Sequence, residues 1–306
     1  MQTVNKDVVV IGNGIAGITA GIYLKRSSLN AIVLGNGAPG GKLNNIHRID
    51  NYPGVPFANG PDLAMKLVEQ ALALNVLLDY GNVYEVTRNE DGTFLVRSDN
   101  GVYAANAVIV ATGSSPKKIG VPGEKELNGM GVSYCATCDG NFFKGMRVAV
   151  YGYMDHAVED AIYLGGIAKK LYFLAPKEIS STERHMAALN RLDNLTMIEG
   201  ATIVSIDGKS KVTGITYKVG DEEKKLAVDA IFPLADEIAS TEFLNSLGVQ
   251  FNKGFIVVDA GMSSNVPGLY ACGDIVDKRL RQLANAAGEA SVAATNAINY
   301  VRSLKK

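Results

Sequence analysis

The chain lacks the features that mark several other classes of protein. Its 306 residues include only three cysteines and three histidines, and 30 basic residues nearly balance 31 acidic ones, for a net charge of -1. Three cysteines argue against a framework of structural disulfides, and the even charge balance gives no sign of a nucleic-acid partner. No apolar run approaches the roughly 20 residues that span a bilayer, and no signal-peptide pattern opens the chain. We therefore expect no nucleic-acid or membrane partner and a cytoplasmic location.

The N-terminal segment has the pattern of a dinucleotide-binding unit. An apolar run at residues 7–11 leads into the sequence GNGIAG, and a helix pattern follows. Gly12 permits a tight turn, Gly14 lets the backbone approach a pyrophosphate, and Gly17 lets the helix pack closely on the strand. The next strand, residues 31–34, ends at Gly35, where ribose binding normally requires an acidic residue. That departure argues against a plain NAD-binding domain.

The same strand, turn and helix pattern restarts at residues 147–174, which indicates an internal repeat. Pro116 and Pro122 precede it and mark a boundary near residue 115. With 47% hydrophobic residues, the chain can bury the cores of two domains. We predict an α/β protein with two Rossmann-like, three-layer ββα nucleotide-binding domains, the second inserted in the first. Residues 1–115 and 246–306 form the outer domain, and residues 116–245 form the central domain.

Cys135-Ala-Thr-Cys138-Asp139 is the most informative motif. A C-x-x-C pair can lower the pKa of one thiol, close as a disulfide, and exchange with the disulfide of a partner. The alternative is half of a structural zinc site, which needs four ligands. Cys272 ends an apolar strand and is expected to be a small core residue. His47, His156 and His185 show no ligand-like grouping in the sequence, so we predict no metal site.

Four segments together resemble the low-molecular-weight flavin thioredoxin reductases. They are GNGIAG, ATGSSPKKIGVPGE, SYCATCDGNFF and YACGDIVDKRLRQLANAAGEA, which begin at residues 12, 111, 133 and 270. Their order and spacing fit along nearly the whole chain. The resemblance implies a homodimer that binds one non-covalent FAD per chain, in the outer domain, and reduces the disulfide of thioredoxin.

The resemblance also implies roles for single residues. Cys138 would face the flavin, Cys135 would attack thioredoxin, and Asp139 would handle protons, although Asp139 in this position is also typical of a simple cap. Lys42 stands where the family often has glutamine, and its positive charge is expected to raise the flavin potential. The implied FAD-binding residues are Gly12, Gly14, Ala16, Gly17, Gly40, Gly41, Lys42, Leu43, Asn51, Thr112, Gly113, Gly273, Asp274, Arg281, Gln282 and Leu283.

The second βα turn departs from the family, in which a glycine-rich motif normally binds the NADPH pyrophosphate. Here the sequence from Gly152 is GYMDHA, so Met154 fills the space of a central glycine and Asp155 adds a negative charge. Residues 175–178, Ala-Pro-Lys-Glu, offer no arginine pair for the 2′-phosphate, and residues 230–237 lack the family's glycine pattern. We therefore predict that NADPH is not bound and that electrons come from ferredoxin, as in the ferredoxin-dependent flavin thioredoxin reductases.

Three alternatives stay open at this point. In the first, the altered turn belongs to an NADPH site that still works, or works with NADH. In the second, the protein is a flavin-binding redox sensor without turnover. In the third, the second nucleotide-binding site holds another ligand, such as an additional flavin. His156, within the altered turn, is expected to be an exposed residue at a helix start rather than an acid catalyst.

Overall fold

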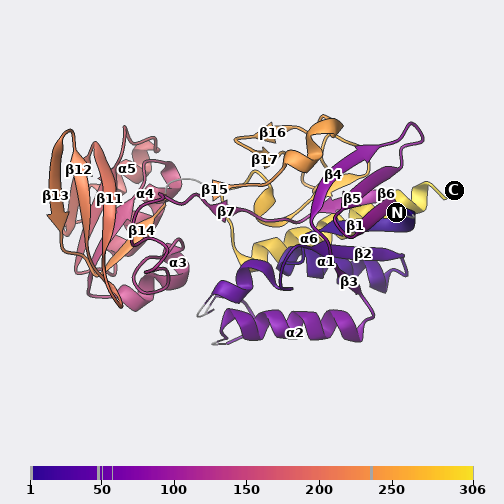
Figure 1. Ribbon diagram of the computed structural model, residues 1–306, viewed down its shortest axis with the longest axis horizontal. Helices are drawn as coiled ribbons and strands as arrows, with labels where there is room; N and C mark the ends of the chain where they lie inside the picture. Colours follow the sequence, from indigo (N-terminus) through magenta and orange to yellow (C-terminus); the bar gives the residue numbers. More distant parts are fainter. Residues whose placement is uncertain (1–2, 47–48, 50, 57, 235–236, 306) are drawn as a thin grey trace. The chain divides into compact units, whose positions relative to one another are not determined.

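The computed structural model describes residues 3–46, 49, 51–56, 58–234 and 237–305 (Figure 1). The chain divides into two units, Met1–Ser115 with Ile238–Lys306, and Pro116–Glu237. It passes between them at β7 (Ser115–Pro116) and β15 (Glu237–Ile238), two short strands that pair with each other. Residues 238–245, predicted above as part of the central domain, lie in the first unit, because Phe243 and Leu244 are buried in its core.

The first unit is built on a sheet with the strand order β3-β2-β1-β6-β5-β4, in which β18 pairs with the end of β6. The pairs among β1, β2, β3, β6 and β18 are parallel, whereas β4 and β5 join as an antiparallel extension. Residues 8–10 are all valine because both faces of this central strand are covered. The strands are β1 (Thr3–Ile11), β2 (Ala31–Gly35), β3 (Leu77–Tyr80), β4 (Val83–Arg88), β5 (Phe94–Ser98), β6 (Gly101–Val110) and β18 (Leu269–Ala271), with a hairpin of β16 (Phe251–Asn252) and β17 (Phe255–Ile256).

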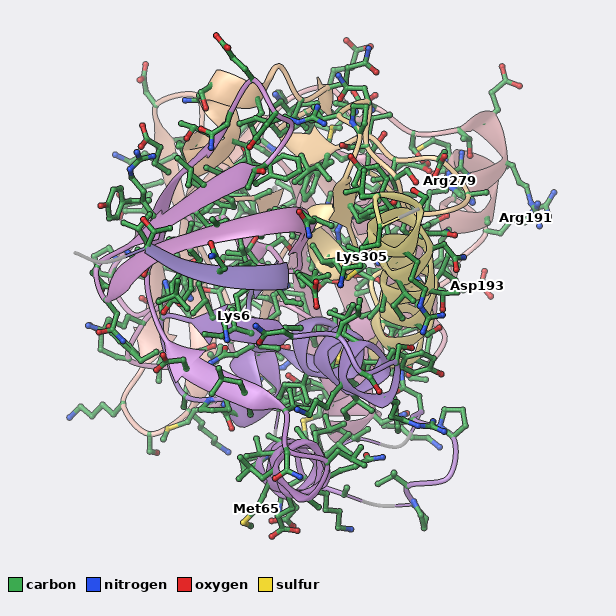
Figure 2. The ribbon with its side chains drawn as sticks, turned by 90° about the vertical axis from the view of Figure 1, so that its right-hand side faces the viewer. Lys6, Met65, Arg191, Asp193, Arg279 and Lys305 are labelled. Atoms are coloured by element: carbon green, nitrogen blue, oxygen red, sulfur yellow. A yellow bond between two sulfur atoms is a disulfide. The ribbon has the colours of Figure 1, made fainter. Side chains whose placement is uncertain are left out.

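Helices cover one face of this sheet. The long C-terminal helix α6 packs against α1 through alanines at positions 286, 290, 293, 294 and 297, which repeat at helical spacing and are buried. Beyond its end, Lys305 pairs with Asp7 at 3.0 Å, while Met65 points to solvent from α2 (Figure 2). The helical segments are α1 (Ile15–Arg26), η1 (Gly41–Asn45), α2 (Gly60–Ala73), η3 (Glu242–Leu247), η4 (Gly273–Ile275) and α6 (Leu283–Ser303).

The second unit repeats the architecture on a smaller scale. Its parallel sheet has the order β10-β9-β8-β14, with helices on one face and a three-stranded antiparallel sheet, β11-β12-β13, on the other. The prediction of an α/β fold with Rossmann-like parallel sheets is therefore confirmed. The elements are α3 (Ala136–Asp139), η2 (Gly140–Phe143), β8 (Arg147–Tyr151), α4 (Asp155–Gly165), β9 (Lys170–Ala175), α5 (Glu183–Leu189), β10 (Leu195–Glu199), β11 (Ala201–Gly208), β12 (Val212–Val219), β13 (Glu222–Leu226) and β14 (Ala230–Pro233).

Within the described parts of both units, no helix combines the length and the apolar character that crossing a bilayer requires.

Candidate active site: a glycine cradle and a dithiol

The glycines of the first βα turn serve two different purposes. Gly12 has a φ of +115°, and a side chain on Gly17 would collide with the carbonyl oxygen of Gly12, so packing requires both glycines. Gly14 faces open space instead, since an added Cβ would meet nothing nearer than the carbonyl oxygen of Gly40 at 3.9 Å. Gly14 is also the N-cap of α1, which has no side-chain cap and no acidic residue in its first turn. The N–H groups of this helix end are therefore placed to bind an anion.

A second glycine loop lies against this turn. The Gly40 N–H donates to the carbonyl oxygen of Asn13 at 2.8 Å, and Gly40 forms a parallel bridge with Gly14. The amide of Asn13 occupies the space that a side chain on residue 35 would need, and it donates to the carbonyl oxygen of Gly37 at 2.8 Å. The missing acidic residue at the end of β2 thus has a steric explanation, because Gly35 leaves room for Asn13.

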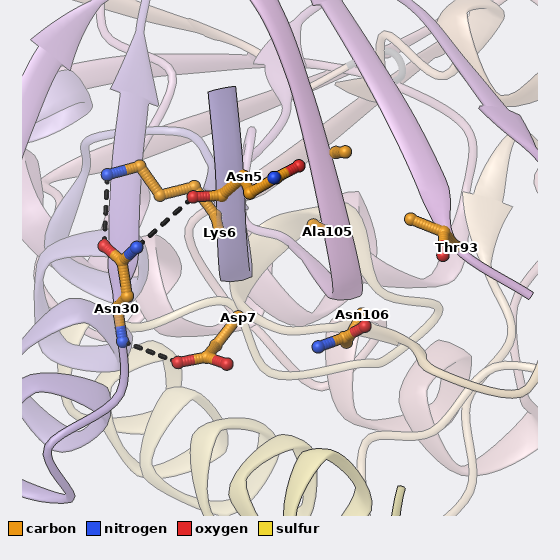
Figure 3. A pocket seen from close by; sticks show the side chains of 8 residues that line it. Asn5, Lys6, Asp7, Asn30, Thr93, Ala105 and Asn106 are labelled. Carbon is orange, nitrogen blue, oxygen red and sulfur yellow. Dashed lines mark hydrogen bonds between the residues drawn. The ribbon is translucent and has the colours of Figure 1, made fainter. Parts of the chain in front are cut away.

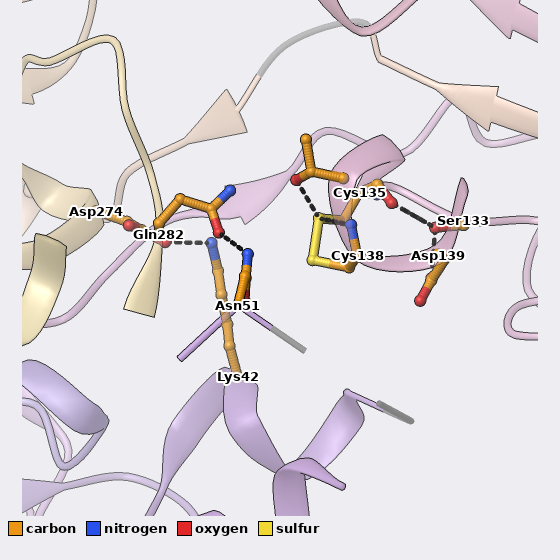
Figure 4. Close-up of a disulfide and its surroundings, with 9 residues drawn as sticks. Lys42, Asn51, Ser133, Cys135, Cys138, Asp139, Asp274 and Gln282 are labelled. Carbon is orange, nitrogen blue, oxygen red and sulfur yellow. Dashed lines mark hydrogen bonds and ion pairs between the residues drawn. A yellow bond between two sulfur atoms is a disulfide. The ribbon is translucent and has the colours of Figure 1, made fainter. Parts of the chain in front are cut away.

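Residues far apart in the sequence meet beside these loops (Figure 4). The Lys42 ammonium pairs with Asp274 at 2.9 Å and donates to the hydroxyl of Ser114 at 3.0 Å. The Asn51 amide donates to the side-chain oxygen of Gln282 at 2.9 Å. Ser114 is buried and was missed by the sequence analysis, although it lies inside the ATGSSPKK segment that carries the resemblance.

Two of the predicted cofactor residues have structural duties of their own. The guanidinium of Arg281 lies 4.3 Å from the centre of the Phe255 ring and donates to the carbonyl oxygen of Lys278 at 3.0 Å. It therefore braces the loop that precedes α6. Leu43 is buried in the core, so its side chain packs among helices.

The residues of the first unit fit a dinucleotide such as FAD. Bare glycine backbone, an uncapped helix start and an open position at Gly14 together suit a pyrophosphate. Gly113 has a φ of +73°, and an added Cβ there would meet nothing within 4 Å, while Thr112 beside it is exposed. We call the turn at residues 12–17, with Gly40 and Gly113 beside it, the glycine cradle. It leaves space where a ligand must approach and is filled where helix and strand pack.

The second unit carries the dithiol at the start of α3. Cys135 and Cys138 form a disulfide, with their Cα atoms 5.3 Å apart. Cys135 is the N-cap of α3, and its sulfur accepts the Cys138 N–H at 3.2 Å and lies 3.5 Å from the hydroxyl of Thr137. Ala136 is buried in the same core as α4 and anchors the motif to that helix. Both cysteines thus belong to a short element that the Ala136 side chain attaches to the core of the second unit.

Ser133 connects the dithiol to Asp139 (Figure 4). Its hydroxyl donates to Asp139 Oδ2 at 2.6 Å and accepts the Cys135 N–H at 3.2 Å, and the residue is only 4% exposed. The sequence analysis missed Ser133, since a serine two residues before a C-x-x-C motif carries no signal by itself. Cys272 is fully buried, as predicted, and burial raises the pKa of its thiol to about 12.

The βα turn of the second unit repeats the first with the same backbone contacts. The Ser180 N–H donates to the carbonyl oxygen of Tyr153 at 2.7 Å, and Met154 bridges Ser180 in parallel, as Gly14 bridges Gly40. Met154, Ser180 and Ser181 therefore occupy the places of Gly14, Gly40 and Gly41. These three glycine positions of the first unit therefore carry side chains in the second, whereas Gly12 keeps a glycine counterpart in Gly152.

The Asp155 carboxylate accepts hydrogen bonds from residues at the start of α5, whereas the sequence analysis considered only the negative charge that it adds to the turn. Its Oδ1 accepts from the Ser181 hydroxyl at 2.6 Å and from the Thr182 N–H at 3.1 Å. Burial raises the pKa of Asp155, but hydrogen bonds from Ser181 and His185 outweigh it and lower that pKa to about 2. The carboxylate therefore stays charged while it holds the start of α5 against the start of α4.

In the described chain, one group of side chains lies close enough together to hold a metal ion, namely Asp155, Glu159 and His185. The sequence analysis missed this grouping because α4 and α5 bring it together. However, His185 Nδ1 lies 2.9 Å from Asp155 and Nε2 lies 3.3 Å from Glu159, so each ring nitrogen already faces a carboxylate. His156 is exposed, as expected, whereas His47 lies outside the described residues.

Residues 175–178 and 230–237 are the other two segments of the second unit that depart from the family pattern. Lys177 follows β9, but its ammonium lies over the Tyr153 ring, 3.8 Å from the ring centre. In the third altered segment, residues 230–233 form β14 and Leu234 is buried, whereas residues 235 and 236 lie outside the described chain.

A polar recess lies at the opposite end of β1 (Figure 3). There the Asn30 amide donates to the carbonyl oxygen of Asn5 at 3.2 Å, and Asp7 accepts the Asn30 N–H at 2.8 Å. Ligands of open α/β sheets bind beyond the carboxyl ends of the strands, and this recess is at their amino ends. It is therefore separate from the cofactor cradle.

Comparisons with known proteins agree with this geometry. Residues 6–290 match the family described as pyridine nucleotide-disulphide oxidoreductase. The thioredoxin reductase of Bacillus subtilis (strain 168) is 36% identical over 305 residues, which cover 98% of this chain and 96% of that protein.

Solved structures give the same result. The thioredoxin reductase of Streptococcus pyogenes MGAS5005 is similar with a TM-score of 0.90 at 34% identity, over 99% of this chain and 100% of that one. A ferredoxin-flavin thioredoxin reductase of Clostridium acetobutylicum is similar with a TM-score of 0.56 at 30% identity, over 100% of this chain and 99% of that one.

Proposed function

We propose that this chain, which belongs to the pyridine nucleotide-disulphide oxidoreductases and, within them, to the thioredoxin reductases, takes electrons from reduced ferredoxin. On this proposal it binds one FAD per chain, uses the Cys135–Cys138 pair as its redox-active disulfide, and reduces thioredoxin. We further propose a homodimer, which light scattering of the purified protein would test.

The glycine cradle would hold the cofactor. Gly14 and the start of α1 would face the pyrophosphate, and Asp274, held by Lys42, would face the ribitol side. FAD supplies an acceptor that takes up electrons singly or in pairs. Lys42 is expected to raise the potential of the flavin because its positive charge favours the reduced form.

The reduced dithiol would carry out two exchange reactions. The Cys135 thiolate attacks one sulfur of the thioredoxin disulfide, which forms a mixed disulfide and releases the other sulfur as a thiolate. The Cys138 thiolate then attacks the Cys135 sulfur, which reforms the disulfide seen in the structure and releases the second thioredoxin sulfur. Two electrons pass to thioredoxin, and Asp139, held by Ser133, is placed to exchange a proton with this region.

The proposal of ferredoxin rather than NADPH as electron donor rests on the comparison of the two βα turns. The same backbone bridge joins Gly14 to Gly40 in the first unit and Met154 to Ser180 in the second. The first turn leaves the space next to Gly14 open, whereas the equivalent residue of the second turn, Met154, has a side chain. A pyrophosphate must approach this backbone closely. The turn of the first unit permits that approach, whereas the side chain of Met154 opposes it in the equivalent turn of the second unit.

An anaerobic titration followed by the visible absorbance of the flavin tests the donor. We expect reduced ferredoxin to bleach the flavin within seconds and NADPH to leave it oxidised. A matched control uses the Cys135→Ser variant, whose flavin should still be bleached although thioredoxin reduction is lost. Bleaching by NADPH within seconds would contradict the proposed donor.

Salt dependence tests how the donor docks. Ferredoxins are generally acidic, so we expect ferredoxin to dock at basic residues of this protein. Salt screens the attraction between exposed charges, so the rate of flavin reduction should fall as the salt concentration is raised from about 50 to about 300 mM. Thioredoxin reduction from the dithiol of prereduced protein serves as the control under the same conditions. A ferredoxin rate that does not change with salt would argue against this docking mode.

One observation favours the NADPH alternative. The N-cap residue Met154 makes no side-chain cap on α4, and an uncapped helix start attracts an anion. The same titration separates the alternatives. Failure of the wild-type protein to reduce any disulfide with either donor would favour a redox sensor. A stoichiometry of two flavins per chain would indicate a second flavin at the altered βα turn of the second unit.

A further inference from the structure

A buried ion pair lies behind the turn that presents Asp274. Lys278 and Glu289 pair at 2.6 Å, and their side chains are only 11% and 13% exposed. Glu289 comes from α6, and Lys278 comes from the loop between η4 and α6. Neither residue is among those that the resemblance assigns to the cofactor.

Glu289 holds the backbone of this turn directly. Its Oε2 accepts the Gly273 N–H at 2.9 Å, while its Oε1 accepts from the Asn285 amide at 2.9 Å. Gly273 has a φ of +78°, so no side chain is easily placed there. An added Cβ on Gly273 would lie 3.0 Å from the Cβ of Ala16, which shows that the turn lies against the start of α1.

The turn is therefore fixed from two sides. Behind it stands the Glu289 carboxylate, and in front of it stands the helix end with the open position at Gly14. Asp274 follows Gly273 directly and pairs with Lys42. Any shift of the Gly273 backbone would move Asp274 relative to the α1 N-terminus.

We propose that Glu289 is a positioning residue for the FAD site and that Lys278 supplies its counter-charge. The Gly273 N–H bond keeps Asp274 and the start of α1 at the spacing that the ribitol and the pyrophosphate require. This inference rests on the proposed FAD cofactor but not on the identity of the electron donor.

The ion pair and the hydrogen bond can be tested separately. Removing one partner of a buried pair leaves an unpaired charge, whereas replacing both partners by neutral groups of similar size is often tolerated. Two double variants follow, Lys278→Met with Glu289→Gln and Lys278→Met with Glu289→Leu. Both remove the two charges, but only the glutamine keeps a carbonyl oxygen that can accept the Gly273 N–H.

The measurement is FAD binding to the apo-protein, followed by quenching of flavin fluorescence, together with thermal unfolding of each apo-protein. We expect the glutamine double variant to bind FAD within about threefold of wild type, and the leucine double variant to bind at least ~10-fold more weakly, as the loss of one hydrogen bond predicts. The leucine double variant leaves the Gly273 N–H without this acceptor and should unfold at a lower temperature, so FAD affinity is compared at a temperature at which both apo-proteins are folded.

Equal FAD affinity of the two double variants would overturn the inference. As a matched control, Lys224→Met with Glu222→Gln removes an exposed pair, 2.9 Å apart, in the second unit and should leave FAD binding unchanged. Failure of the wild-type apo-protein to bind FAD at all would instead overturn the proposed function, so the two failures are distinguishable.

Discussion

At the scale of single residues, the two kinds of glycine in the first βα turn predict opposite effects of the same substitution. Gly14 has a φ of -74°, which alanine adopts readily, and it faces open space. Gly14→Ala should therefore change the free energy of unfolding of the apo-protein by less than ~1 kcal/mol and weaken FAD binding. Gly17→Ala should destabilise the fold by ~3 kcal/mol or more, because its Cβ would collide with the Gly12 carbonyl oxygen.

Urea unfolding of the apo-proteins and FAD titration measure these two effects. A Gly14→Ala variant that binds FAD as tightly as wild type would show that the pyrophosphate does not approach this position. A stable Gly17→Ala variant would contradict the packing described for the turn.

Ser133 makes a second prediction at this scale. Ser133→Ala removes the hydroxyl that holds Asp139 and the acceptor of the Cys135 N–H. We expect thioredoxin reduction to slow by ~10-fold, with the cysteines still able to form their disulfide, because proton transfer by a positioned group contributes on that order or more. Ser133→Thr keeps the hydroxyl and should retain most activity, and Ser98→Ala, at another buried serine, serves as a control. An unchanged pH profile and rate in Ser133→Ala would rule out this positioning role.

The sequence could mark Cys135, Cys138 and the glycines as candidates because the spacing of these residue types by itself predicts disulfide exchange and phosphate binding. It could not identify Ser133, Ser114 or Glu289. The partners of these residues are determined by turns, as with Ser133 and Asp139, or by contacts between distant segments, as with Ser114 and Lys42. A single serine or glutamate has too many ordinary uses for its position to predict such a contact.

At the scale of elements, the short apolar runs of the sequence predicted the inner parts of strands. Residues 7–11 and 31–34 lie within β1 and β2, which the structure extends to Thr3–Ile11 and Ala31–Gly35. The antiparallel sheet β11-β12-β13 was not predicted. Its edge strand β13 has the sequence EEKKL and is mostly exposed, so it shows neither an apolar run nor an alternating pattern.

Helix α4 makes a prediction about pH. Burial and the neighbouring Glu159 carboxylate raise the pKa of Asp160 to about 6, from an ordinary value of 3.8. The folded protein therefore binds more protons than the unfolded chain between about pH 4 and pH 6, and stability falls as the pH rises through that window. Asp160→Asn removes this penalty and should raise the free energy of unfolding at pH 7.5 by ~1–3 kcal/mol, with little gain at pH 4.

Urea unfolding at the two pH values gives the comparison. Asp193→Asn, at an exposed loop position, is a suitable control. A gain for Asp160→Asn that is the same at both pH values would show that packing, rather than charge, causes it.

At the scale of the whole molecule, the two units differ in the number of chain segments from which they form: the first needs two separate segments and the second only one. The proposed FAD residues come from both segments of the first unit, with Gly14 and Gly113 before the second unit and Asp274 after it. The second unit is one continuous segment with its own cores. The sequence predicted this division from the repeat and the prolines, but the return point differed by eight residues, since residues 238–245 contain no proline or repeat that marks a boundary.

This division predicts that the first unit binds FAD without the second. β7 and β15 pair where the chain leaves and returns, so residues 115 and 238 lie close together and a short glycine-serine linker can join them. A protein made of residues 1–115, this linker and residues 238–306 should fold and bind one FAD, with an affinity within about tenfold of the full chain, because each unit has its own core. Isolated residues 116–237 should fold, form the Cys135–Cys138 disulfide and bind no flavin. Flavin fluorescence and circular dichroism measure both outcomes, and the Gly14→Ala variant of the joined protein is the control. A folded, joined protein that does not bind FAD would mean that the second unit supplies an essential part of the cofactor site.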